Sequence, residues 1–140
     1  MTRPILILLS TIALFAVSSA FFGYKVVYQT GYGAFALLAV VIAGTFFWLW
    51  VKRSTPLALG MVFSWSGATG VMAWWWLYSL LGRPDWMQDN GLLFVFLSTY
   101  LVGAVLHLEV IGRSFALSRG ATYAPIVAAV VVSMALALFL

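Results

Sequence analysis

A chain of 140 residues with 65% hydrophobic and only 7% charged residues cannot cover the surface of a soluble globule, because soluble domains carry about 25% charged residues. We therefore expect an integral membrane protein with almost no domain outside the bilayer. The net charge of +4 comes from scattered basic residues and does not indicate nucleic-acid binding. The absence of cysteine excludes disulfides, thiolate metal sites and cysteine nucleophiles.

Five apolar segments are long enough to cross a bilayer, which needs roughly 20 residues per helix. In chain order they cover residues 4–27, 33–51, 56–81, 91–111 and 121–140. Short polar breaks separate them, the first at residues 28–32 and the longest at residues 82–90. The sequence thus predicts an all-α, polytopic membrane helix bundle that forms a single transmembrane domain over residues 1–140.

The first segment has two interpretations. Arg3, the apolar run after it and the small residues at 18–20 also match a signal peptide with a cleavage site. The apolar stretch continues through Phe21 and Phe22, which favours a retained helix. Cleavage would leave four helices in the same orientation.

The basic residues predict the orientation, because cytoplasmic loops carry an excess of lysine and arginine. With the N-terminus in the cytoplasm, the cytoplasmic ends carry Arg3, Lys52, Arg53, Arg113 and Arg119, and the outer ends carry Lys25 and Arg83. We therefore expect a multi-pass protein of the cell membrane, the inner membrane of a bacterium, with the N-terminus inside and the C-terminus outside.

The centre of the third segment is rich in hydroxyls and glycine, with Ser-Trp-Ser-Gly-Ala-Thr-Gly at residues 64–70. Small residues at four-residue spacing allow helix backbones to approach closely. One stripe holds Gly60, Ser64, Gly67 and Val71, and an adjoining stripe holds Ser66, Gly70 and Ala73. We expect a helix-packing seam here, formed by Ser64, Ser66, Gly67, Thr69 and Gly70 and wide enough for two neighbouring helices. The alternative is a polar lining of a substrate path.

The chain is tryptophan-rich, with seven tryptophans. Most of them lie near the predicted interfaces, as in the aromatic belts of membrane proteins. The consecutive residues Trp74, Trp75 and Trp76 point about 100° apart on a helix, so they cannot all line one pocket. Trp65 lies near the middle of the membrane and is expected either in the core or in a cavity wall.

The fourth segment carries the only histidine, His107, which shares a helix face with Tyr100 and Gly103. The spacing Gly103-x-x-x-His107 resembles the Ala-x-x-x-His of bacterial light-harvesting polypeptides. That resemblance implies space for a planar macrocycle whose metal the imidazole ligates; a hydrogen-bonded histidine of the core is the simpler alternative. The candidate ligand residues are thus His107, Tyr100, Gly103 and Trp65, and the candidate ligands are a tetrapyrrole, a carotenoid, a quinone or a bound lipid. No metal site is predicted.

Glu109 is the only acidic residue away from the outer loop, and it lies four residues before Arg113. Side chains at this spacing share a helix face and can pair. The pair is expected to hold the cytoplasmic end of the helix. The alternative is a proton-coupling carboxylate in a small homodimeric transporter, since ionisable groups in membranes often serve transport.

Five helices together with Trp76-Leu77-Tyr78 and Arg83-Pro84-Asp85-Trp86 resemble the tryptophan-rich sensory family. That resemblance implies binding of porphyrins or cholesterol-like molecules. The family's double-proline loop is absent here, and the local similarity follows the third segment rather than the first. The chain is therefore not assigned to that family.

The sparse chemistry favours a small non-catalytic membrane subunit that packs into a larger membrane complex in a structural or accessory role. Its expected partners are membrane lipids and other transmembrane subunits, or copies of the same chain. The alternatives are the homodimeric transporter that uses Glu109 and a binder of a pigment, quinone or lipid near His107 and Trp65. No enzymatic activity is predicted.

Overall fold

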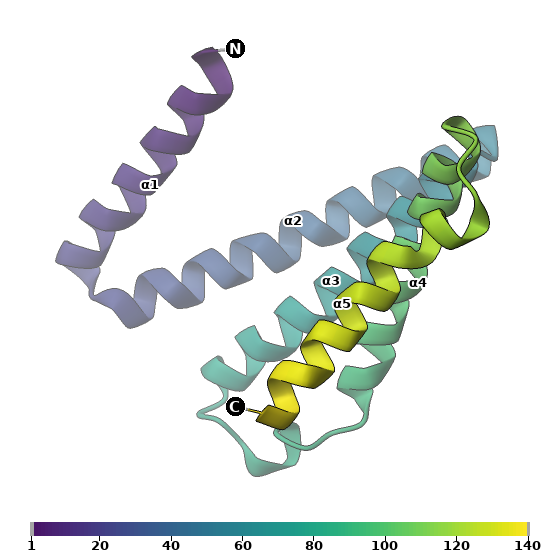
Figure 1. Cartoon of the computed structure of the whole chain (residues 1–140). Helices are drawn as coiled ribbons and strands as arrows, with labels where there is room; N and C mark the ends of the chain where they lie inside the picture. The colour runs from purple at the N-terminus through teal and green to yellow at the C-terminus, as the bar shows by residue number, and fades with distance from the viewer. Residues whose placement is uncertain (1, 140) are drawn as a thin grey trace.

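The computed structural model describes residues 2–139 and is helical throughout (Figure 1). Its elements are α1 (Thr2–Phe22), α2 (Tyr24–Arg53), α3 (Pro56–Leu80), the short 3-10 helix η1 (Asp85–Met87), α4 (Leu92–Ser114) and α5 (Arg119–Phe139). No strand occurs within residues 2–139. The five α-helices are each long and apolar enough to cross a membrane. An all-α chain with five candidate spans is therefore confirmed.

The first break between spans lies at Gly23, and the predicted break at residues 28–32 is wrong. Gly23 has a φ of 82°, a backbone conformation that glycine adopts far more readily than other residues. Residues 28–32 belong to α2, which is 30 residues long. Two of their polar side chains bond within the helix or to α3: the Thr30 hydroxyl donates to the carbonyl of Val26 at 2.9 Å, and the Gln29 amide donates to Ser79 Oγ at 3.1 Å.

The other boundaries differ less from the predicted ones. The first span ends at Phe22 rather than at residue 27, and α4 continues beyond residue 111 to Ser114. Before α4, Asn90 Oδ1 accepts the backbone N–H of Leu92 at 2.9 Å, which supplies an acceptor that the helix start lacks. Residue 140, the predicted end of the last span, lies outside the described residues.

The helices pack as a row in chain order rather than as a bundle closed around a common core. α3 lies between α2 and α4, and its contacts with these two are the most extensive in the protein. α5 contacts α4, and α1 contacts α2. Figure 1 shows α1 leaving the end of α2 at an angle and standing apart from the rest. Lipid solvates apolar side chains as well as a protein core does, so nothing forces the row to close.

Small residues make the central contacts of this row. The buried residues of α2 are Gly33, Ala36, Ala39 and Ala43, and those of α3 include Ala58, Gly60 and Gly67. Such residues allow the close approach on which helix association in membranes depends. By contrast, the most apolar stretches of α1 and α5 have 0% of their residues buried. The rest of the chain therefore leaves most of the surface of these two outer helices uncovered.

Candidate functional site

The backbones of α3 and α4 touch at two glycines. A Cβ atom at Gly67 would lie 2.7 Å from the Cα of Tyr100 and 2.8 Å from the carbonyl oxygen of Phe96. A Cβ atom at Gly103 would lie 2.7 Å from the Cα of Ser64. Neither position has room for a side chain, so these two glycines set the distance between the helices.

The predicted packing seam serves two neighbours, but not along the predicted stripes. Gly70 was placed on the second stripe, yet it faces α4, where it meets the ring of Phe96, and Gly67 meets the α4 backbone at Phe96 and Tyr100. Ser66 and Thr69 instead line a shallow groove of about 380 Å³ shared with α2. The Thr69 hydroxyl donates to the carbonyl of Trp65 at 2.7 Å, a bond that keeps it within its own helix.

His107 packs against α3 between Gly60 and Ser64. Its Nδ1 lies 3.4 Å from Ser64 Oγ, and its Cδ2 would lie 3.4 Å from a Cβ atom at Gly60. Its Nε2 is buried and has no hydrogen-bond partner among the described residues. A buried polar atom without a partner costs free energy unless something outside the chain satisfies it.

A cavity of about 590 Å³ lies beside His107 on one side of α3, with α2 and α4 as its walls. It is lined by Ser64, Trp65, Ala68, Tyr100 and His107, together with Phe35, Met61, Val71, Met72 and Leu97. We call it the mid-membrane groove. Its volume falls within the range of about 300–1,000 Å³ typical of small-molecule sites. The structure thus brings together three of the four candidate ligand residues, and Gly103 packs behind them on Ser64.

The mid-membrane groove adjoins another cavity, which lies near the N-terminal end of α2. This second cavity, of about 910 Å³, shares Val71 and Met72 with the groove and is lined by Lys25 and Arg83 as well as by aromatic residues. We call this second cavity the outer cavity.

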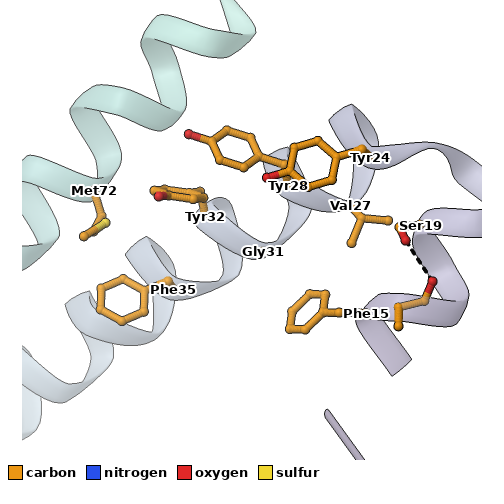
Figure 2. Close-up of a pocket in the computed structure, with 10 residues that line it drawn as sticks. Phe15, Ser19, Tyr24, Val27, Tyr28, Gly31, Tyr32, Phe35 and Met72 are labelled. Atoms are coloured by element: carbon orange, nitrogen blue, oxygen red, sulfur yellow. Dashed lines mark hydrogen bonds between the residues drawn. The ribbon is translucent and has the colours of Figure 1, made fainter. Parts of the chain in front are cut away.

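A ladder of tyrosines on α2 lines the outer cavity. The rings of Tyr24 and Tyr28 lie 6.1 Å apart, and those of Tyr28 and Tyr32 lie 4.4 Å apart. Figure 2 shows the three rings on one side of α2, with Met72 of α3 opposite Tyr32. The view is centred on a neighbouring apolar cavity of about 600 Å³ between α1 and α2. Sequence reasoning missed the ladder because residues 28–32 were predicted as a loop, although four-residue spacing was the available signal.

Glu109 ties α4 to α5. Its Oε1 accepts the Tyr123 hydroxyl at 2.7 Å, and its Oε2 lies 3.9 Å from Arg113, whose side chain is 81% exposed. One turn further along α4, Gly112 allows Thr122 of α5 to approach. The expected pair with Arg113 is present, but the shorter contact, with Tyr123, was not foreseen because it joins separate helices.

The three consecutive tryptophans face three directions, as helix geometry requires. Trp74 is buried and donates from Nε1 to the carbonyl of Met87 at 3.1 Å. Trp76 covers Gly33 of α2, whereas Trp75 is 36% exposed. Two of the three therefore act in packing, and Trp75 lines the outer cavity.

Within residues 2–139, no three His, Cys, Asp or Glu side chains gather closely enough to hold a metal ion. The fold and the two adjoining cavities define a class: an all-helical protein with five candidate membrane spans and an apolar groove along its middle helix. No known protein family matches the chain, and neither a curated protein nor a solved structure shows significant similarity to it.

Proposed function

We propose that this protein is a small non-catalytic subunit that packs against other transmembrane chains, or against copies of itself, in a membrane complex. The observation that carries the proposal is the open row of helices, in which α1 and α5 have no buried residue in their most apolar stretches. A helix that contacts only one neighbour has several faces left for partners. The proposed location is the inner membrane of a bacterium, with the N-terminus in the cytoplasm.

Site-specific photocrosslinking in native membranes tests this proposal. A photoreactive phenylalanine analogue at Ile7, which is 67% exposed on α1, should give protein adducts of discrete mass. The matched control is the same analogue at Gln88 in the loop before α4, a position exposed outside the helices. If Ile7 and other exposed positions of α1 and α5 give only lipid adducts, the proposal is wrong.

A second candidate function is the binding of a hydrophobic ligand in the mid-membrane groove. It is favoured by the convergence of Trp65, Tyr100 and His107 on one cavity and by the unpartnered Nε2 of His107. An absorption spectrum of the purified protein tests for a pigment, and mass spectrometry of its organic extract tests for a quinone or lipid. A protein that carries neither pigment nor any stoichiometric extractable molecule would contradict this function.

The transporter alternative gains no comparable support. Both carboxylate oxygens of Glu109 have partners, one on α4 and one on α5. The 2.7 Å hydrogen bond from Tyr123 favours a role of Glu109 in joining α4 to α5.

A further inference from the structure

We propose that the mid-membrane groove and the outer cavity together bind one anionic phospholipid. Its phosphate lies between Lys25 and Arg83, and one acyl chain runs past Met72 to Trp65. This proposal rests on the second candidate function, ligand binding in the groove, and it names the ligand class.

The cationic end of the outer cavity has no protein counter-charge. Lys25 and Arg83 both line it, whereas the nearby acids Asp85 and Asp89 do not. The one ion pair found among residues 2–139 joins Glu109 and Arg113, which lie elsewhere. Two cations that face a cavity without an acidic partner are complementary to a phosphate, and basic pockets between membrane helices are known to bind anionic headgroups.

The backbone after α3 is bent so that Arg83 lines this cavity. Gly82 has a φ of 78° and Arg83 a φ of 64°, and the N–H of Arg83 donates to the carbonyl of Tyr78 at 2.8 Å. Positive φ is uncommon for a residue with a long side chain. The bond from Arg83 to Tyr78 spans five residues and closes the C-terminus of α3, and this closure positions Arg83 at the cavity.

The region between the charged end and the groove has the composition of a membrane interface. The tyrosine ladder, Trp75 and Tyr78 line it, and tyrosine and tryptophan are enriched where headgroups meet acyl chains. The hydrogen bond from Gln29 to Ser79 joins α2 to α3 at this level. This bond therefore fixes the distance between α2, which carries Lys25, and the C-terminal end of α3, which precedes Arg83.

The apolar part of the groove has the length of one acyl chain. From Trp75 to Trp65, α3 rises about 15 Å at 1.5 Å per residue. That is about half of the 30 Å hydrocarbon core, the depth that one leaflet fills. Val71 and Met72 line both cavities, so the groove and the outer cavity adjoin along α3. A long path with charge at one end suits a phospholipid better than a flat, uncharged pigment.

Lipid titration of the full chain in detergent micelles, read by native mass spectrometry, tests the headgroup. The unmodified protein should prefer phosphatidylglycerol over phosphatidylethanolamine with the same acyl chains. In Lys25→Gln/Arg83→Gln that preference should fall about thirtyfold. Lys52→Gln/Arg53→Gln removes two cations from the other end of α2 and should leave the preference unchanged. Lys25→Gln alone should act in the same direction if the double variant is unstable.

A second pair of variants tests the acyl chain. Ala68 lies in the floor of the groove, so Ala68→Phe should block binding of both lipids. Ser66 lies on the other side of α3, and Ser66→Phe should leave binding unchanged.

The outcomes separate the two proposals. If Ala68→Phe abolishes binding but the loss of Lys25 and Arg83 leaves the preference intact, the anionic headgroup is wrong and ligand binding in the groove stands. An equal loss in Lys52→Gln/Arg53→Gln also overturns the headgroup site, because the effect is then one of net charge. If Ala68→Phe binds both lipids normally, the lipid site and the second candidate function both fail.

Discussion

Gly67→Ala should destabilise the protein even though alanine is the better helix former. The added Cβ would lie 2.7 Å from the Cα of Tyr100, so α3 and α4 must separate along the seam. When two packed surfaces move 0.5–1 Å apart, each atom pair loses about a quarter to a half of its dispersion energy. Overpacking of this kind costs about 1–3 kcal/mol, which exceeds the gain of about 1 kcal/mol from helix propensity.

Gly44→Ala on α2 is the matched control, because a Cβ atom there would meet nothing within 4 Å. It makes the same chemical change and should be neutral or stabilising by up to about 1 kcal/mol. The assay is reversible unfolding of both variants in mixed micelles with increasing denaturing detergent. If Gly67→Ala is as stable as Gly44→Ala, α3 and α4 do not pack as closely as described. The distance between the walls of the mid-membrane groove is then wrong as well.

Three further predictions concern the contact between α4 and α5, the link between α1 and α2, and the orientation of the chain in the membrane. Tyr123→Phe removes the donor that holds Glu109 and should cost about 1 kcal/mol or more in the same unfolding assay; an unchanged stability would mean that this bond does not join α4 to α5. Gly23→Ala forces a φ of 82° and a ψ of 150° on an L side chain and should cost about 1–3 kcal/mol, whereas unaltered stability would refute the positive-φ link between α1 and α2. Because the chain has no native cysteine, Gln88→Cys should react with an impermeant maleimide on intact cells and Leu117→Cys only after permeabilisation; the reverse pattern would overturn the proposed orientation.

Hydropathy alone predicted the five spans, because any segment that crosses lipid must satisfy its backbone as a helix and be apolar along its length. It failed at residues 28–32, where polarity indicated a loop. Thr30 bonds to its own helix and Gln29 to α3, so both side chains find protein partners without a loop. The actual break at Gly23 depends on a single backbone conformation that composition does not reveal.

Site residues could be predicted only where the sequence of one helix gives both the depth of a residue in the membrane and the face of the helix on which it lies. Trp65, Tyr100 and His107 were singled out as candidates, and they line one cavity. Phe35 was missed because an apolar residue that faces lipid looks the same in sequence as one that faces another helix. The tyrosine ladder was missed because residues 28–32 were predicted as a loop. For the same reason the row-like packing could not be predicted, since the partner of each helix is not encoded in its hydropathy.

Native mass spectrometry of the protein released directly from its own membrane tests the central proposal most directly. One chain has a mass of 15.4 kDa. The open row of helices predicts an assembly of higher mass that contains further copies of the chain or a second transmembrane protein. A species of 15.4 kDa that carries only lipid, and persists at the mildest detergent conditions, would contradict it.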